Sequence, residues 1–258
     1  MQLMGRRADQ ISWPRAPRDW SRRFCEDRDR IDIWAASTDA TDKMVRILAK
    51  DLGASELQRA SAFRHSLERN RFIARRHLLR SIIGCYLNVD ATAVEFNNTA
   101  RGKPTLGGDF ADAGLHFNVA HSDGLAVVAI SNVGAIGVDV EKIRRFDEIE
   151  QLVESCFSHR ERTAFGLVPP NEKSAAFFRL WTRKEALLKA NGDGIGRSLD
   201  IEVPFDSHEA AERDDRPKLR CHRGTWYFYD LSPAPGFAVV LVAPVVMSRL
   251  GCWRWTPQ

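Results

Sequence analysis

Two acidic residues in the second half of the chain have the chemistry of a metal site. Asp139 and Glu141 alternate with Val138 and Val140, so a strand would place both carboxylates on one face and both valines on the other. Two neighbouring carboxylates repel each other, and a hard divalent cation between them relieves that repulsion. An acidic pair at a strand end is more often a solvated edge, so the pair needs support from elsewhere in the chain.

A helical pattern around Glu185 and Lys189 gives that support. Trp181, Glu185 and Lys189 are spaced four residues apart, so a helix would place them along one stripe. A glutamate and a lysine at this spacing commonly form an ordinary surface pair. The tryptophan indicates that this stripe is half buried, where an idle ion pair is costly. A third metal-binding carboxylate, followed by a cation for a leaving phosphate, would use the same spacing.

Other polar residues could hold phosphate groups. His121 and Ser122 end an apolar run and precede an Asp-Gly turn, where a lone histidine is usually structural but could also bind phosphate. Lys103, on a Gly-Lys-Pro turn, offers a further positive charge. The clearest amphipathic helix of the first half, at 70–87, has arginines along its flanks, which is also typical of a solvated margin. These arginines are Arg71, Arg75, Arg76 and Arg80.

The elements that must position these residues are helices and strands in both halves of the chain. Apolar periodicity predicts helices at 41–52, 55–69, 70–87, 147–168 and 174–190. It predicts strands at 31–35, 115–120, 125–131, 135–141, 201–203, 225–231 and 236–242. The pattern favours an α+β fold of two similar lobes that meet near Gly134. We expect a tail at 1–30, an N-terminal lobe at 31–134 and a C-terminal lobe at 135–258.

The composition is that of an ordinary globular protein. The chain has 258 residues, of which 44% are hydrophobic and 28% charged, and a net charge of +4 that fits an anionic partner without choosing one. Its five cysteines form no Cys-x-x-Cys pair, which argues against a disulfide framework or a zinc site. No signal-like segment and no apolar run of about 20 residues is present, so we expect a cytoplasmic protein.

The order of the motifs resembles that of the Sfp-type 4′-phosphopantetheinyl transferases. The matching segments are GKP (102–104), FNVAHS (117–122), IGVDVEKI (136–143), FSHRE (157–161) and LWTRKEALLKANGDGI (180–195). The resemblance extends over about residues 31–243. Its most specific part is the pair of motifs GVD (137–139) and WTRKEALLK (181–189). Ala120 stands where the family often has serine, which leaves His121 in place.

The resemblance implies that coenzyme A binds in the cleft between two α+β lobes. Asp139, Glu141 and Glu185 would hold Mg²⁺ at its pyrophosphate, and Glu185 would help to deprotonate the attacking serine of an apo acyl or peptidyl carrier protein. Lys189 would neutralise the leaving phosphate of 3′,5′-ADP. We expect a monomer that acts on neither nucleic acid nor membrane.

The same resemblance implies a set of nucleotide-binding residues. Lys103, Pro104, His121 and Ser122 would contact the nucleotide, with His121 at the 3′-phosphate, and Asp139 would also face the cofactor. The helix at 70–87 would supply further cations, of which we favour Arg71 and Arg75. Carrier contacts are expected near 144–165, where Phe146 and Phe157 lie among charged residues.

Two alternatives remain open from the residues alone. A metal-dependent nuclease could use the same acidic residues and lysine, but such enzymes usually place Glu-x-Lys on one strand, and the charge is mild for duplex binding. A relative that binds coenzyme A or a carrier without transfer would be expected to lose a metal-binding carboxylate or the lysine. All four residues are present here.

Overall fold

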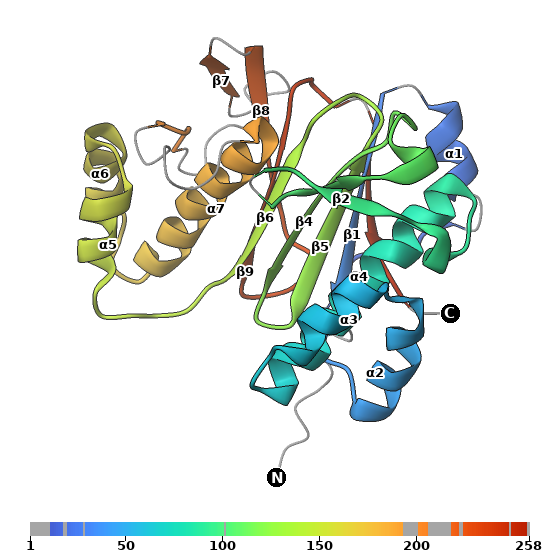
Figure 1. The fold of residues 1–258 in the computed structure, drawn as a ribbon. Coiled ribbons are helices and arrows are strands. Elements are labelled where there is room, and N and C mark those ends of the chain that lie inside the picture. Colours follow the sequence, from blue (N-terminus) through green and yellow to red (C-terminus); the bar gives the residue numbers. More distant parts are fainter. Residues whose placement is uncertain are drawn as a thin grey trace.

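Two four-stranded sheets pack face to face, and helices cover their outer faces (Figure 1). The structure is a computed structural model that describes residues 11–17, 20–27, 29–100, 102–192, 201–205, 218–221, 224–247 and 249–256. The first sheet has the order β10 (Arg249–Arg254), β1 (Arg30–Ser37), β5 (Leu125–Ser131) and β4 (His116–Ser122). The second has the order β6 (Gly137–Lys142), β9 (Phe237–Ala243), β8 (Gly224–Leu231) and β7 (Lys218–Cys221). This arrangement confirms the predicted α+β class with two lobes.

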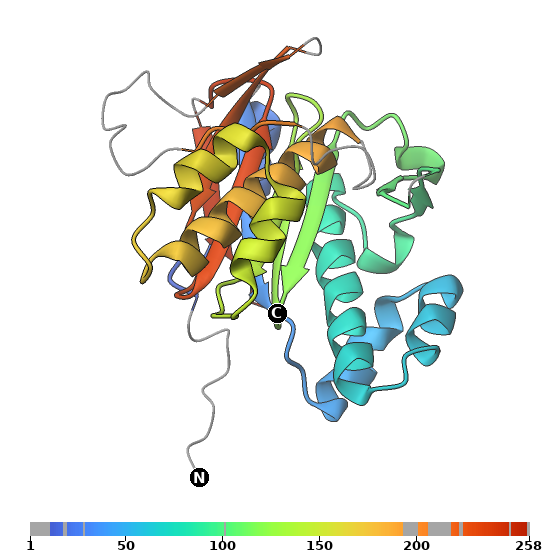
Figure 2. The same cartoon turned by 90° about the vertical axis from the view of Figure 1, so that its left-hand side faces the viewer.

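Alternating side chains give each sheet two buried faces. Ile31 and Ile33 of β1 pack with Val138 and Val140 of β6 in a core between the sheets. Trp34 of β1 points the other way, toward helix α4 (Ser66–Leu87). The outer face of the second sheet packs on α5 (Ile149–Cys156), α6 (His159–Gly166) and α7 (Lys173–Asn191). Figure 2 views the molecule from the side of these three helices. The remaining elements are α1 (Trp20–Glu26), α2 (Asp42–Leu48), α3 (Ala54–Ser61), β2 (Phe96–Asn98) and β3 (Pro104–Leu106).

The edge strands β4 and β6 of the two sheets lie next to each other (Figure 1). A side chain of β4 joins them. Asn118 of β4 is buried, and its Oδ1 accepts a hydrogen bond of 2.8 Å from the backbone N–H of Val138. This N–H lies on the edge strand of the second sheet, where Asn118 supplies the acceptor that a neighbouring strand would otherwise supply. The asparagine therefore fixes β6 relative to β4.

We expect Asn118→Ala to lower the free energy of unfolding by about 1–3 kcal/mol, because the Val138 N–H would stay buried without an acceptor. Chemical denaturation followed by circular dichroism measures this change. The control is Asn98→Ala on β2, where the side chain is exposed, and we expect a change within about 0.5 kcal/mol. Equal effects of the two substitutions would contradict a structural role for the Asn118 hydrogen bond.

Several predicted elements have different bounds in the structure. The single helix predicted at 147–168 is two helices, because Phe157 is extended and Ser158 begins α6 with a capping box to Glu161. The helices predicted at 55–69 and 70–87 are α3 and a longer α4 that begins at Ser66. No strand forms at 201–205. Strands β2, β3, β7 and β10 were not predicted.

The segment predicted to be a tail is packed on the fold from residue 11 onward. Ile11 and Phe24 are buried, and Trp20 of α1 makes edge contacts with Trp34 and Tyr86. At the other end of the chain, β10 pairs in parallel with β1 in the first sheet. The division into lobes at residue 134 stays a prediction. Within the described residues, no helix is both long and apolar enough to cross a membrane.

Candidate active site

Strand β6 and helix α7 bring the predicted carboxylates to one place. Val138 and Val140 lie in the core between the sheets, so Asp139 and Glu141 project from the opposite face of β6 toward α7, as the alternation predicted. Glu185 lies on α7 and is 8% exposed, while Asp139 is 5% exposed. The predicted stripe on α7 is also confirmed, since Trp181 and Lys189 are half buried on either side of Glu185.

Gly137 lets the backbones of β6 and α7 come into contact. A Cβ atom at this position would lie 1.9 Å from the carbonyl oxygen of Ala186 and 2.5 Å from the backbone nitrogen of Ala190. No side chain can occupy that space unless the helix moves away from the strand. The glycine before Asp139 is therefore the residue that sets the distance between the carboxylates of β6 and those of α7. A glycine inside a strand pattern indicates a close approach of another backbone, but it does not identify which segment approaches.

Three cationic and acidic side chains form a chain of contacts at the C-terminal end of α7. Lys189 Nζ donates a hydrogen bond of 2.6 Å to Asp139 Oδ1. Lys103 Nζ donates one of 2.7 Å to the backbone carbonyl oxygen of Lys189. Burial lowers the pKa of Lys103, and the positive charge of Lys189 lowers it further. The Gly-Lys-Pro turn is thus attached to the helix that carries Glu185.

Ser122 holds the second carboxylate of β6 in place. Its hydroxyl donates to Glu141 Oε2 over 2.9 Å, and its oxygen accepts a 3.1 Å hydrogen bond from the backbone N–H of Lys142. Ser122 was predicted to bind a phosphate group. In the structure its contacts are those of a residue that orients Glu141, and this pairing was not predicted.

The electrostatics of the three carboxylates fit a hard divalent cation. Burial raises the pKa of Asp139, Glu141 and Glu185, and the charge of Asp139 raises the pKa of the two glutamates further. Asp139 Oδ2 is buried and has no hydrogen-bond partner among the residues that the structure describes. Three carboxylates that repel one another, one of them with an unpartnered oxygen, form the kind of donor set that Mg²⁺ prefers.

These oxygens do not enclose an ion by themselves. Among the described residues, no three side chains of histidine, cysteine, aspartate or glutamate are gathered as closely as a metal site requires. Mg²⁺ usually keeps several waters and is held by one or two carboxylates together with substrate phosphates. Asp139, Glu141 and Glu185 therefore fit an ion that arrives with a phosphate ligand better than a closed protein cage.

His121 and Arg75 form an electropositive position on the α4 side of β4. The pKa of His121 is lowered to about 4 by desolvation of its ring and by the positive charges of Arg75 and Lys189. Burial also lowers the pKa of Arg75, to about 10; the charge of Glu68 opposes this shift, and those of Arg71 and Arg59 add to it. Within the described chain, the guanidinium of Arg75 makes no ion pair. A half-buried arginine that makes no ion pair, next to a histidine, indicates a site for an anion.

We expect His121 to be neutral at pH 7 in the free protein and to gain a proton when a phosphate binds beside it. A dianion next to the ring favours the imidazolium, so its pKa should rise above about 4 with coenzyme A and rise less with dephospho-coenzyme A. Since the bound form takes up a proton, coenzyme A should bind more tightly as the pH falls through the pKa of the complex. ¹⁵N NMR titration of the imidazole measures this pKa. The resonances of exposed His159 on α6 should not respond to cofactor. An equal rise of the His121 pKa with both cofactors would show that His121 does not contact the 3′-phosphate.

The other arginines of α4 are paired within the protein. Arg71 Nε donates to Asp39 Oδ1 over 2.7 Å and lies 3.8 Å from Asp123. Arg76 and Arg80 share the carboxylate of Glu56, and Arg80 is buried. Of the two arginines favoured from the sequence, Arg75 makes no ion pair with any described residue, and Arg71 would have to leave, or share, its acidic partners to bind a nucleotide.

Lys103 and Pro104 border a cavity of about 380 Å³. Pro104 begins β3 and pairs opposite Asn98 of β2, a position that a proline can take at the start of a strand. The start of β4 and the C-terminal end of α7 form the other walls, with Phe117 and Ala190 among the lining residues. The cavity is on the Lys103 side of the carboxylates and has the size of a small-molecule pocket.

The structure has a buried ion pair beside the site that was not predicted from the sequence. Lys184 Nζ lies 2.8 Å from Glu161 Oε2, and both side chains are 3% exposed. Lys184 also donates to the carbonyl oxygen of Ile201, and Glu161 accepts from the backbone N–H of Val203. These contacts attach α6 and the segment 201–205 to α7, next to Glu185. The Ser-x-x-Glu capping signal at Ser158 predicts one contact of Glu161 but not its pairing with Lys184.

Comparisons with known proteins point to one family. A model of the 4′-phosphopantetheinyl transferase superfamily matches residues 135–239, and a model of the N-terminal part of 4′-phosphopantetheinyl transferases matches residues 32–133. The 4′-phosphopantetheinyl transferase HetI of Nostoc sp. is 36% identical over 230 residues, which are 89% of this chain and 91% of that protein. The 4′-phosphopantetheinyl transferase Sfp of Bacillus subtilis is 29% identical over 190 residues, covering 72% of this chain and 80% of Sfp.

Proposed function

Because the chain belongs to the 4′-phosphopantetheinyl transferase superfamily, we propose that it moves the 4′-phosphopantetheine group of coenzyme A to a serine of an apo acyl or peptidyl carrier protein. The reaction releases 3′,5′-ADP and requires Mg²⁺. The observation that supports this proposal most directly is the group of three carboxylates, Asp139, Glu141 and Glu185, with an unpartnered oxygen on Asp139 and Lys189 beside it. The arrangement suits a phosphate ester and a hard cation.

The reaction breaks the P–O bond between the two phosphates of coenzyme A and forms a P–O bond to the carrier serine. Mg²⁺, when bound, would stabilise the negative charge that develops on the pyrophosphate oxygens. Glu185 would help to remove the proton of the serine hydroxyl, since burial and Asp139 raise the pKa of its carboxyl toward that of a working base. Lys189 would transfer its contact from Asp139 to the leaving phosphate of 3′,5′-ADP.

The remaining predicted residues would orient the cofactor. Lys103 and Pro104 would lie along the nucleotide in the cavity at β3, and His121 with Arg75 would hold the 3′-phosphate. Ser122 would act mainly through Glu141, whose carboxylate it already holds. Arg71 would contribute once it is released from Asp39. Positioning of this kind accounts for most of the catalysis in phosphoryl transfer.

The carrier would approach beside Glu141. The predicted contact residue Phe157 is buried against Phe165 and Phe177, so it is not available to a partner. Phe146 is half buried and lines a hollow of about 430 Å³ that extends from Glu141 to Leu152. We expect this hollow, with exposed Arg144 at its rim, to face the carrier. The cytoplasmic location and the monomeric state stay predictions from the sequence.

The test is mass spectrometry of several apo-carriers incubated with the protein, coenzyme A and Mg²⁺. We expect a phosphopantetheine-sized mass gain on at least one carrier, which disappears when a chelator removes the metal ion. The gain should map to one serine after proteolysis. The proposal fails if no carrier gains mass although coenzyme A binds, since such a protein would be a binding relative without transfer.

A further inference from the structure

Lys189 lies between the proposed metal ligands and the proposed nucleotide-binding residues. Its Nζ donates to Asp139 Oδ1, and its backbone carbonyl oxygen accepts from Lys103 Nζ over 2.7 Å. Burial raises the pKa of the three carboxylates, and the charge of Lys189 opposes that rise at each of them. Burial and the charges of Arg75 and Lys189 lower the pKa of His121. One ammonium group is therefore within electrostatic range of both parts of the site.

In the free protein, Lys189 holds an oxygen that a metal ion would need. Lys189 Nζ and Asp139 Oδ1 are 2.6 Å apart, and the side chain of Asp139 is buried. A divalent cation on this carboxylate would lie within a few ångströms of the ammonium group. Two positive charges so close repel each other, and burial weakens the screening of that repulsion. A metal ion therefore competes with Lys189 for Asp139.

A phosphate group would end this competition. The lysine side chain has a flexible stem and three rotatable donors, so Nζ can turn from a carboxylate to a phosphate without movement of its helix. The side chain of Lys189 is 30% exposed, which leaves room for an incoming ligand. Its backbone would stay fixed by Lys103 during this turn. Asp139 would then be free, and the phosphate oxygens would add further ligands for a hard cation.

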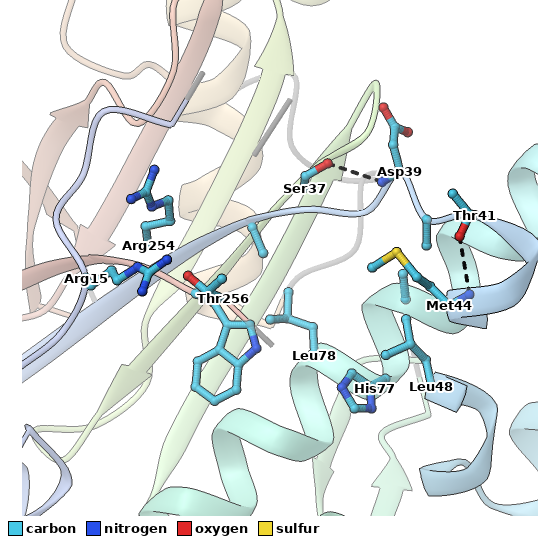
Figure 3. Close-up of a pocket in the computed structure, with 14 residues that line it drawn as sticks. Arg15, Ser37, Asp39, Thr41, Met44, Leu48, His77, Leu78, Arg254 and Thr256 are labelled. Carbon is cyan, nitrogen blue, oxygen red and sulfur yellow. Dashed lines mark hydrogen bonds between the residues drawn. The ribbon is translucent and has the colours of Figure 1, made fainter. Parts of the chain in front are cut away.

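Arg71 of α4 is also held by a carboxylate, but that carboxylate lies apart from the proposed metal ligands. Its Nε contacts Asp39 Oδ1 over 2.7 Å. Asp39 borders a separate cavity of about 400 Å³ between α2 and α4 (Figure 3). The described residues that line this cavity include none of the three proposed metal ligands. Release of Arg71 by a nucleotide would therefore free no ligand for a metal ion, whereas release of Lys189 would.

We propose that Lys189 is the counterion of Asp139 in the free protein and that its transfer to a phosphate of coenzyme A releases Asp139 for the metal ion. This inference rests on the proposed function, which supplies both ligands. The metal ion and the nucleotide then bind cooperatively, and by thermodynamic linkage each raises the affinity for the other by the same factor.

The test measures the affinity of the full chain for Mn²⁺, a probe that accepts the same oxygen ligands as Mg²⁺. Electron paramagnetic resonance reports free Mn²⁺ in titrations without nucleotide and with saturating 3′,5′-ADP. Lys189→Met should tighten Mn²⁺ binding to the free protein by roughly tenfold or more, the strength of one hydrogen bond between charged groups. In the wild type, 3′,5′-ADP should tighten Mn²⁺ binding, and in Lys189→Met it should do so by a smaller factor.

Two other lysines provide the controls. Lys173 is also on α7, its side chain is 27% exposed, and it contacts Glu150 over 2.9 Å, so Lys173→Met is matched to Lys189→Met and should leave the Mn²⁺ affinity unchanged. Lys103→Met removes a positive charge next to Lys189 but frees no carboxylate oxygen, so it should tighten Mn²⁺ binding by no more than roughly threefold. Circular dichroism checks the fold, and Lys189→Gln is the second neutral variant if Lys189→Met does not fold.

The proposal is wrong if the neutral variants of Lys189 bind Mn²⁺ no more tightly than the wild type, or if Lys103→Met has an equal effect. It is also wrong if 3′,5′-ADP tightens Mn²⁺ binding by the same factor in these variants as in the wild type. Absence of transfer to any carrier, together with the expected Mn²⁺ affinities, would contradict the proposed function alone. Normal transfer by the wild type, with Mn²⁺ affinities that do not depend on Lys189, would contradict this inference alone.

Discussion

Replacing Glu185 with glutamine is expected to lower kcat/KM for phosphopantetheinyl transfer by roughly 10³-fold, since a metal-binding carboxylate contributes several kcal/mol to the transition state. Glutamine keeps the size of the side chain but removes the charge that would face Mg²⁺ and accept the serine proton. The decrease should appear in assays at carrier concentrations well below KM, with rates read by mass spectrometry.

The fold should survive this substitution. The carboxylate of Glu185 is buried next to Asp139 and Glu141, which repel it, so removal of its charge should not lower the free energy of unfolding in metal-free buffer. Glu172→Gln, at the exposed start of α7, is the matched control and should leave transfer unchanged. If Glu185→Gln retains near-normal transfer, the metal and base roles belong to other residues.

Gly137→Ala is expected to reduce transfer by roughly 10²-fold and to lower the free energy of unfolding by about 1–3 kcal/mol, although it alters no charged group. The new methyl group would meet the backbone of Ala186 at 1.9 Å, and backbone atoms cannot turn aside as a flexible side chain can. The helix must shift away from β6, which separates Glu185 from Asp139. Transfer assays and denaturant unfolding measure the two effects.

The same substitution at a second glycine is the control for the general effect of replacing glycine with alanine. Gly166, at the end of α6, has open space where a Cβ would lie, so Gly166→Ala should keep full transfer and equal or greater stability. Wild-type transfer by Gly137→Ala would show that the distance between β6 and α7 does not control the site.

The parts of the site that the sequence predicts are those with a strong local period. Alternation of valine and acidic residues predicts the faces of β6, and the four-residue spacing from Trp181 to Lys189 predicts the buried stripe of α7. Both patterns describe a single element and its core face, so they need no knowledge of the neighbouring elements. The general α+β class follows in the same way.

Contacts between distant segments are not encoded in any local period. From the sequence, the Ser122 hydroxyl could donate either to a phosphate or to Glu141. Its hydrogen bond to Glu141 follows from the placement of β4 beside β6. The pairing of Lys184 with Glu161 likewise depends on how α6 packs on α7. The break between α5 and α6 was hidden because both helices continue one amphipathic pattern, and only two extended residues, Phe157 and Ser158, separate them.

The parallel pairing of β10 with β1 has a consequence for the order of events during synthesis. Residues 30–35 lie opposite residues 249–254, so β1 has an open edge until residues 249–254 have left the ribosome. An uncovered edge strand can pair with another chain, and contacts this far apart in sequence form slowly. A protein stopped before residue 249 would therefore carry a complete set of proposed catalytic side chains on a sheet that is prone to aggregate.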